Sequence, residues 1–346
     1  MANKGDNMDI LIDAFGGDHA PEEVIAGSVE ALKERDDFNA VFVGKQDVIE
    51  NLLKDYQYDQ KRVRIIDAPD VITCEEEPTV AVRRKPNSSI CVAFKELKEN
   101  PNAGAFVSAG STGAVLVGAT LKLGRIKGIN RPATSPILPT LIDGKNVILL
   151  DSGANADCKS INLVQFAIMG SCYAEAMGVE NPRVALLSNG AEDEKGNMLN
   201  HETFPLLKEL KGVNFVGNVE ARDILTGEYD VVVCDGFSGN VALKGIEGAI
   251  NMLLKLLKQN IYSSLPGKIG GLFLKDTFKK LKLKLDYNNH GGALFLGVNK
   301  AVIKTHGSSK RTAIKAAVLQ AAHYATFDIS DRISAKLQLN EPEGNA

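Results

Sequence analysis

The segment NVILLDSGANADCKSINLVQFAIMGSCYAEAMG, residues 146–178, decides the fold. It begins with an apolar run at 146–151, continues through a polar, glycine-containing loop at 152–160, and ends in a helix-like stretch at 161–178. Further units of this kind begin with MDILIDAF (8–15), GAFVS (104–108), RVALLS (183–188) and YDVVVCD (229–235). Continuous Val, Ile and Leu runs that alternate with helices indicate strands buried on both faces of a parallel sheet. We therefore predict an α/β protein with three α/β/α layers and a mostly parallel central sheet.

Composition limits the class of protein. The 346 residues include 40 Lys+Arg and 43 Asp+Glu, a net charge of −3, with 44% hydrophobic and 24% charged residues. These values predict a globular core and argue against a nucleic-acid-binding protein, which is normally strongly basic. No apolar run reaches the roughly 18 residues of a spanning helix, and the N-terminus does not resemble a secretory signal. We expect a cytoplasmic protein with one domain over 8–330, or two intertwined subdomains, and a polar tail at 331–346.

Several common kinds of site are disfavoured by missing motifs. The five cysteines have no C-x-x-C spacing and the five histidines have no i, i+4 pair, so we expect no metal site. The chain contains no G-x-G-x-x-G, no P-loop and no G-x-S-x-G. A standard dinucleotide site, a P-loop nucleotide site and a serine hydrolase are therefore disfavoured, and we expect no cofactor.

The loops that follow the predicted strands are the expected binding site. They concentrate Gly, Asn, Asp and Ser, and in open α/β sheets the ligand lies at the carboxyl ends of the strands. Glycine allows close approach of the backbone, and helix N-termini offer unpaired N–H groups to anions. Five such loops at one edge would form a cradle for phosphate or an oxyanion, although each loop taken alone reads as an ordinary turn.

Ten sequence blocks carry a resemblance to a known family. They are DAFGGDHAP (13–21), AVRRKPNSS (81–89), SAGSTGA (108–114), GRIKGINRPA (124–133), DSGANADCK (151–159), LVQFAIMGS (163–171), GAEDEKGN (190–197), GNVEARD (217–223), DGFSGN (235–240) and HGSS (306–309). In this order they resemble the PlsX-type phosphate acyltransferases of bacterial phospholipid synthesis, from about Met8 to Phe327. Ser111 departs from the family pattern, which usually has Asn there.

The resemblance implies a reaction, a fold and an assembly. The reaction is transfer of a fatty acyl group from acyl carrier protein to inorganic phosphate, which gives acyl phosphate. The implied fold is related to isocitrate/isopropylmalate dehydrogenases and phosphotransacetylases, and the implied assembly is a homodimer. Because phosphate is itself the nucleophile, this chemistry needs no Ser-His or Cys-His pair, which agrees with the missing triad.

The expected catalytic residues follow from the matched motifs. Lys195 would hold phosphate or the oxyanion as a point charge, and Asn240 would donate its amide to the thioester carbonyl. His19 would donate a proton or bind phosphate. Their structural alternatives are an exposed loop lysine for Lys195 and a turn or helix-capping residue for Asn240.

The expected phosphate-binding residues share positions at strand ends. They are Gly16, Gly17, Asp18, Gly110, Thr112, Gly113, Asn155, Asp193 and Asp235. Tight packing is the alternative for the glycines and Thr112, and helix capping is equally expected for Asp18. For Asn155, Asp193 and Asp235, as for Asp151, bonds to the local backbone are the better expectation.

Two basic clusters are candidates for binding the acidic carrier protein. They are Arg83, Arg84 and Lys85, and Arg125, Lys127 and Arg131. Complementary charge speeds the encounter between partners, whereas the alternative is a solvated surface.

Segment 251–285 is locally basic and apolar. Its eight lysines and one acid give +7, which leaves −10 for the rest of the chain. Leu253, Leu254, Leu257, Leu272 and Phe273 are expected to contact the inner face of the cell membrane, close to the downstream glycerol-phosphate acyltransferase. Packing in a core or a dimer is the alternative. The membrane expectation follows from the lipid-like product that the resemblance implies.

Two other functions remain as alternatives. One is an NAD-dependent β-decarboxylating dehydrogenase-like enzyme, since such folds also lack the dinucleotide motif. The other is a non-enzymatic membrane-surface scaffold acting through segment 251–285.

Overall fold

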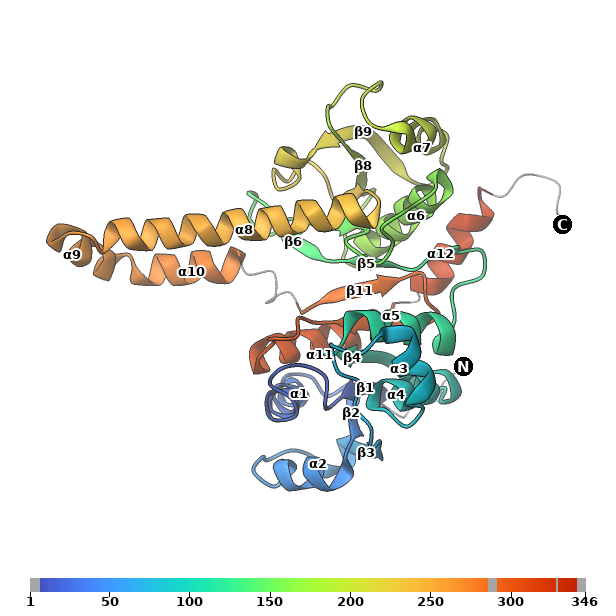
Figure 1. Cartoon of the computed structure of the whole chain (residues 1–346), viewed down its shortest axis with the longest axis vertical. Helices are drawn as coiled ribbons and strands as arrows, with labels where there is room; N and C mark the ends of the chain where they lie inside the picture. The colour runs from blue at the N-terminus through green and yellow to red at the C-terminus, as the bar shows by residue number, and fades with distance from the viewer. Residues whose placement is uncertain (1–6, 286–290, 328, 341–346) are drawn as a thin grey trace.

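The structure is a computed structural model that describes residues 7–285, 291–327 and 329–340. Its strands form two sheets (Figure 1). The first sheet has the order β3 (Val63–Asp67), β2 (Phe38–Gly44), β1 (Met8–Asp13), β4 (Ala103–Ser108), β12 (Ala301–Lys304), β11 (Ala293–Leu296) and β5 (Ala133–Ser135). The second has the order β6 (Ile137–Pro139), β7 (Asn146–Leu150), β10 (Val231–Val233), β8 (Arg183–Ser188) and β9 (Asn214–Glu220).

The α/β class and the mostly parallel pairing are confirmed, and the strands are divided between two adjoining sheets. Antiparallel pairing occurs where the sheets adjoin, between β11 and β12, β11 and β5, and β6 and β7. Pro136 separates β5 from β6 and has no N–H to donate to a strand ladder. The chain therefore leaves the first sheet and enters the second at this residue.

Twelve helices surround the sheets in the described residues. They are α1 (Glu22–Glu34), α2 (Gln46–Leu53), α3 (Pro78–Arg84), α4 (Ser89–Glu99), α5 (Thr112–Gly118), α6 (Ser160–Ala176), α7 (Met198–Lys208), α8 (Gly236–Ile261), α9 (Leu265–Phe273), α10 (Lys275–Leu285), α11 (Arg311–Ala325) and α12 (Ile329–Gln338). In Figure 1, α8 projects far from the body and α10 returns beside it, with α9 at the tip. We call this hairpin, residues 251–285, the arm.

The faces of the sheets alternate between separate cores. In β1, Ile10 and Ile12 belong to the core that also contains residues of α1 and α11, whereas Leu11 belongs to the core beneath α4. This alternation follows from the two-residue period of a strand, and it gives the first sheet helices on both faces.

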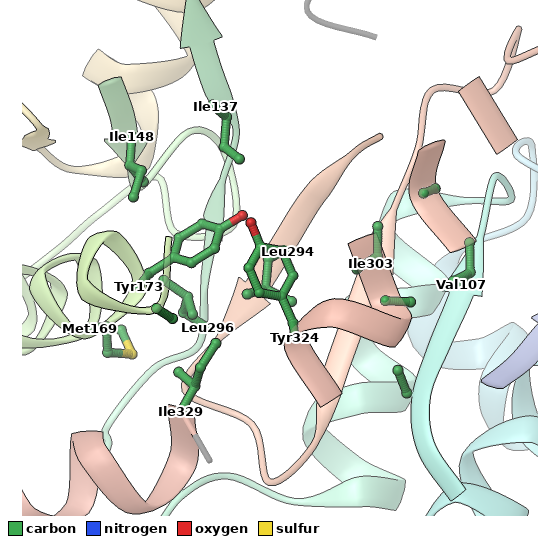
Figure 2. Packing of buried hydrophobic residues seen from close by; sticks show 14 of the residues in the cluster. Val107, Ile137, Ile148, Met169, Tyr173, Leu294, Leu296, Ile303, Tyr324 and Ile329 are labelled. Atoms are coloured by element: carbon green, nitrogen blue, oxygen red, sulfur yellow. The ribbon is translucent and has the colours of Figure 1, made fainter. Parts of the chain in front are cut away.

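One core is continuous across both sheets. Tyr173 of α6 and Tyr324 of α11 pack with ring centroids 5.0 Å apart, and Figure 2 shows their hydroxyl groups directed toward each other. Leu294 of β11 and Ile148 of β7 belong to the same cluster. The two sheets are thus joined by shared apolar packing as well as by the chain.

The predicted tail differs from the structure in part. Residues 331–338 lie in α12, where Ile333 is fully buried. Residues 341–346 of the predicted tail, and His290, lie outside the described residues.

Candidate active site

Three loops at the carboxyl ends of β1, β4 and β12 converge. Asp18 N donates to the carbonyl oxygen of Gly307 over 2.8 Å. A Cβ added at Gly16 would lie 2.4 Å from Asp13 Oδ2 and 2.7 Å from the backbone nitrogen of Gly110. Only glycine fits where the first loop crosses the second this closely, so the sequence GG at 16–17 is required for the loops to meet.

A buried carboxylate holds these loops together. Asp13 Oδ2 accepts a hydrogen bond from Ser108 Oγ over 2.7 Å, and Ser108 Oγ accepts from Gly110 N over 3.0 Å. Burial raises the pKa of Asp13, while hydrogen bonds from Ser89 and Ser108 act in the opposite direction. Asp13 therefore fixes the loop that carries Gly110 and Thr112.

A second buried carboxylate organises the loops of the other sheet. Asp151 accepts five hydrogen bonds, from Thr134 N and Oγ1, Ala154 N, and Asn155 N and Nδ2, at 2.7–3.2 Å. The carbonyl of Asn155 accepts from Gly236 N over 2.8 Å. These bonds attach the loop after β7 to the first turn of α8.

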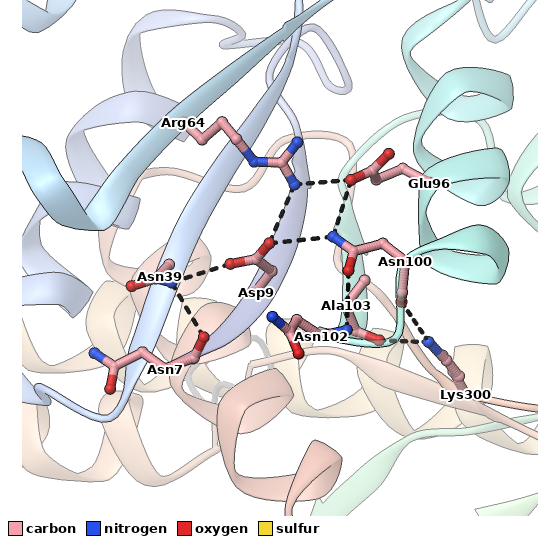
Figure 3. Close-up of polar contacts among 9 residues, drawn as sticks. All are labelled: Asn7, Asp9, Asn39, Arg64, Glu96, Asn100, Asn102, Ala103 and Lys300. Carbon is pink, nitrogen blue, oxygen red and sulfur yellow. Dashed lines mark hydrogen bonds and ion pairs between the residues drawn. The ribbon is translucent and has the colours of Figure 1, made fainter. Parts of the chain in front are cut away.

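A cavity of about 440 Å³ lies elsewhere, at the amino ends of β4 and β12. A polar network surrounds this edge (Figure 3), in which Lys300 Nζ donates to the carbonyl oxygens of Asn100 and Ala103 over 3.1 and 2.6 Å. Because ligands of open α/β sheets bind at the carboxyl ends, and because this cavity contains no predicted site residue, it is not the candidate active site.

The candidate active site is a cavity of about 360 Å³ between the two sheets. Its walls come from the loops after β4, β7 and β12, from β11 and the β5–β6 connection, and from the first turns of α8. The residues that line the cavity are Cys74, Gly110, Thr112, Thr134, Pro136, Ile137, Ser152, Gly153, Asn240, Leu243, Lys244, Glu247, Gly292, Ala293, Phe295, Lys304, Thr305, His306 and Gly307.

The cavity contains charged side chains that the sequence did not indicate. Lys304, the last residue of β12, is 9% exposed, and burial lowers its pKa to about 8. On the opposite wall, Lys244 Nζ lies 2.9 Å from Glu247 Oε2, while Glu247 Oε1 is buried without a hydrogen bond. The only signal for Lys304 was its position just before HGSS, at the end of a short apolar run.

The structure brings three of the predicted site residues into the cavity, namely Asn240, Gly110 and Thr112. Asn240 does not have the helix-capping role given as its structural alternative, because α8 already starts at Gly236 and Asp235 is its N-cap. Asn240 is thus the fifth residue of α8 and its exposed amide faces the cavity, which leaves the amide free of a capping role.

Several predicted residues lie beside the cavity. Gly16 and Gly17 form the close loop crossing, Gly113 packs against Pro78, and Asp18 and His19 are exposed. Ser111 caps α5 by accepting a hydrogen bond from Ala114 N.

Other predicted residues lie away from the cavity lining. Lys195 is exposed on the loop after β8, and Asp193 of that loop forms a 2.6 Å ion pair with Lys208. Asp235 binds Ser238 N and Oγ over 2.8 and 2.7 Å, and Asn155 Nδ2 donates to Asp151 and Pro132. Their hydrogen bonds give Asp235 and Asn155 the local structural roles that were the better expectation.

The basic clusters are only partly free. Lys85 Nζ contacts Glu76 Oε2 over 2.7 Å and the Val71 carbonyl over 2.8 Å. Arg125 and Arg131 donate to the carbonyl oxygens of Asn130 and Asp157. All members except Lys85 are exposed: Arg83, Arg84, Arg125, Lys127 and Arg131.

The arm presents large apolar side chains to solvent. Phe273 is 82% exposed, Leu272 is 72% exposed and Leu253 is 55% exposed, whereas Leu254 is half-buried between α8 and α10. In the part of the chain that the structure describes, every helix is too short or too polar to pass through a bilayer. Within the same residues, His, Cys, Asp and Glu form no group of three that could hold a metal ion.

The fold and cavity define an open α/β protein whose candidate ligand site lies at the carboxyl ends of parallel strands. Residues 8–332 match the family model described as "Fatty acid synthesis protein". The chain belongs to this family. A protein named phosphate acyltransferase from Clostridium novyi is 48% identical over 334 residues, which cover 96% of this chain and 99% of that protein. The recognition of the phosphate acyltransferase family is confirmed.

Solved structures agree on the fold. A phosphotransacetylase from Streptococcus pyogenes has a TM-score of 0.63 and 17% identity, covering 93% of this chain and 95% of that one. A 4-hydroxythreonine-4-phosphate dehydrogenase from Klebsiella pneumoniae has a TM-score of 0.50 and 14% identity, covering 92% and 99%. The predicted relation to phosphotransacetylase and dehydrogenase-like folds is confirmed, and at these identities the likeness concerns the fold alone.

Proposed function

We propose that this protein transfers a fatty acyl group from acyl carrier protein to inorganic phosphate. The observation that carries the proposal is the cavity between the sheets, where Asn240 lies in one wall and Gly110, Thr112 and Lys304 lie in others. Relatives named phosphate acyltransferase support the same activity. A dehydrogenase or a non-enzymatic scaffold gains no comparable support.

The proposed reaction replaces the C–S bond of the thioester with a C–O bond to phosphate. An oxygen of hydrogen phosphate attacks the thioester carbon, a C–O bond forms, the C–S bond breaks, and its electron pair leaves with sulfur. The proton carried by phosphate ends on the carrier-protein thiolate, so the products are acyl phosphate and a free thiol. Asn240 Nδ2 donates to the carbonyl oxygen as negative charge develops there. A thiolate leaves without strong acid assistance because the thiol pKa is about 8.5.

Acyl transfer to phosphate predicts that thiol release requires phosphate. Purified protein, acyl carrier protein thioester and phosphate should release free thiol at a rate that saturates with phosphate, and release should fall to background without it. A thiol-reactive dye measures the rate. Release that is independent of phosphate would identify a thioesterase, and hydride transfer to NAD would favour the dehydrogenase alternative.

The remaining site residues are part of the same proposal. Lys195, which is exposed, would reach the substrate from its own loop or from a second subunit of a homodimer, and His19 and Asp18 would flank the bound phosphate. Asp193, Asp235 and Asn155 would act by shaping their loops. The exposed arginines of the two basic clusters would receive the acidic carrier protein, with Lys85 contributing least because Glu76 already pairs with it.

The arm is proposed to hold the protein at the inner face of the cell membrane, near the downstream glycerol-phosphate acyltransferase. Support comes from the lysine-rich sequence and from exposed Leu272 and Phe273 at the tip. Leu253, Leu254 and Leu257 would contribute from the shaft, Leu254 least because it is half-buried. A second copy of the chain packed along α8 is the competing occupant of the shaft.

Replacing both Leu272 and Phe273 by serine should weaken binding to vesicles of anionic phospholipid at least tenfold. Burial of each side chain is worth about 1.5–3 kcal/mol, and both are lost. Co-sedimentation measures the change. Leu141→Ser is the matched control, since Leu141 is 80% exposed but lies on the body between β6 and β7. Equal vesicle binding by the double variant and the wild-type protein would contradict membrane contact at the tip.

A further inference from the structure

Lys304 is a buried cation without a carboxylate partner. Its Nζ donates to the carbonyl oxygens of Thr305 and, over 3.5 Å, Ala109. Among the residues that the structure describes, no carboxylate oxygen lies within 4.0 Å of this nitrogen. Burying a charge is costly unless it is paired. The protein therefore pays a desolvation penalty here that a bound anion would offset.

Lys300, four residues earlier, is a useful comparison. It too is partly buried, burial lowers its pKa, and its Nζ donates to the carbonyl oxygens of Asn100 and Ala103. Figure 3 shows both bonds within the polar network at the amino end of the strands. Lys304 lies at the carboxyl end instead and lines the candidate active site. The two lysines share their chemistry and differ in the edge they occupy.

Lys304 remains mostly protonated at neutral pH although burial lowers its pKa. Burial lowers its pKa to about 8, while electrostatic interactions with Cys74, Asp13 and Asp18 act in the opposite direction. A pKa of about 8 leaves most of the lysine charged at pH 7. An anion bound beside it would raise the pKa further, because a nearby opposite charge stabilises the charged form.

The two sheets contribute different residues to the walls of the cavity. Lys304, Gly110 and Thr112 come from the first sheet and its loops, while Asn240 comes from α8 beside the second sheet. If Asn240 binds the thioester carbonyl, the wall formed by the first sheet is where the phosphate nucleophile would bind. Phosphate is the anionic reactant, and a buried ammonium with a hydroxyl nearby suits it.

We propose that Lys304 is a further catalytic residue, whose Nζ binds an oxygen of the attacking phosphate in the cavity between the sheets. This inference rests on the proposed acyl transfer to phosphate. Lys304 pairs with the phosphate charge and positions it against the thioester carbon. It takes no covalent part in the reaction and keeps its proton throughout.

Lys304→Met tests the role because it keeps the length of the side chain and removes the charge. The phosphate KM should rise about tenfold and kcat/KM for phosphate should fall about thirtyfold, while the KM for acyl carrier protein thioester stays within about twofold. Lys304→Arg should recover part of the phosphate affinity, since the charge returns. Lys300→Met is the matched control and should leave the phosphate KM unchanged.

The pH profile gives a readout that a purely structural lysine would not move. In the wild-type protein, kcat/KM for phosphate should fall as pH rises through about 8, because the free enzyme loses the proton of Lys304. The Lys304→Met variant should lack this fall. A pH profile that is the same in both proteins would overturn the assignment. An unchanged phosphate KM in Lys304→Met would also overturn it, provided that the melting temperature of this variant matches that of Lys300→Met.

Phosphate binding without turnover separates this inference from the proposed function. Phosphate should raise the melting temperature of the wild-type protein and of Lys300→Met, and should not raise that of Lys304→Met. If the wild-type protein releases no thiol, acyl transfer fails, yet this measurement still decides whether Lys304 binds the anion. If Lys304→Met does not fold, the pH profile of the wild-type protein and the phosphate affinity of Lys304→Arg test the proposal instead. A wild-type profile without a fall near pH 8, together with a Lys304→Arg variant that does not bind phosphate, would overturn it.

Discussion

Replacement of Asn240 by alanine should lower phosphate-dependent thiol release at least hundredfold. This factor corresponds to about 2.7 kcal/mol of transition-state stabilisation, within the range for losing one donor to a developing oxyanion. Asn240 is the predicted site residue that faces the cavity from α8 without serving as a cap. Its amide is therefore a neutral donor on a wall where Lys244 Nζ is already paired with Glu247.

The measurement is kcat/KM for the carrier-protein thioester at saturating phosphate. Asn251→Ala is a suitable control, because Asn251 is exposed on the same helix about three turns further along. Lys195→Ala belongs in the same series, because Lys195 is exposed and lies outside the cavity lining. A comparable loss of kcat/KM in this variant would mean that its loop closes over the cavity or that a second subunit contributes the lysine. Thiol release in Asn240→Ala within a few-fold of wild type would refute the oxyanion role.

Gly239→Ala should destabilise the protein by about 3 kcal/mol or more and abolish most activity. An added Cβ would lie 2.0 Å from the carbonyl oxygen of Asp151 and 2.8 Å from Cys234 Sγ. Neither the backbone of Asp151 nor the buried sulfur of Cys234 can move aside, so the start of α8 must shift instead. Asn240, the next residue, would then leave its place in the cavity wall.

Gly245→Ala is the matched control in the same helix. Nothing lies within 4 Å of a Cβ added there, so the substitution should stabilise α8 by about 0.5–1 kcal/mol through helix propensity. Urea unfolding followed by circular dichroism compares the two variants. Equal stability of Gly239→Ala and the wild-type protein would contradict the close packing between α8 and the loop after β7.

The long apolar runs made most of the parallel strands predictable. The runs 8–15, 104–108, 146–151, 183–188 and 229–235 all contain strands of the structure. The strands β5 and β6 escaped prediction, because they have three residues each and lie outside any long apolar run. The division into two sheets depends on those strands and on Pro136, so it could not be predicted from the runs alone.

Local sequence misled at GFSGN. Its two glycines read as a loop, yet both lie in α8, where Asp151 and Asn155 occupy the space that side chains would need. The helix α12 was missed for the opposite reason, since its polar composition hid the buried positions Ile329 and Ile333. Tertiary contact decided both cases.

The site was predicted best where backbone and side chain act close to their own strand. Gly110, Thr112 and Asn240 could be found from strand-end motifs. Lys304 could not, because a lysine at a strand end is usually a surface residue. Its burial results from contacts between segments far apart in the chain.

Helix α8 begins at the cavity and ends at the tip of the arm. Its 26 residues make a rod of about 39 Å. Because the helix is continuous, a displacement of its far end would be transmitted to the turn that carries Asn240. The helix that carries Asn240 in the cavity wall is thus the same element that carries the apolar side chains of the shaft of the arm.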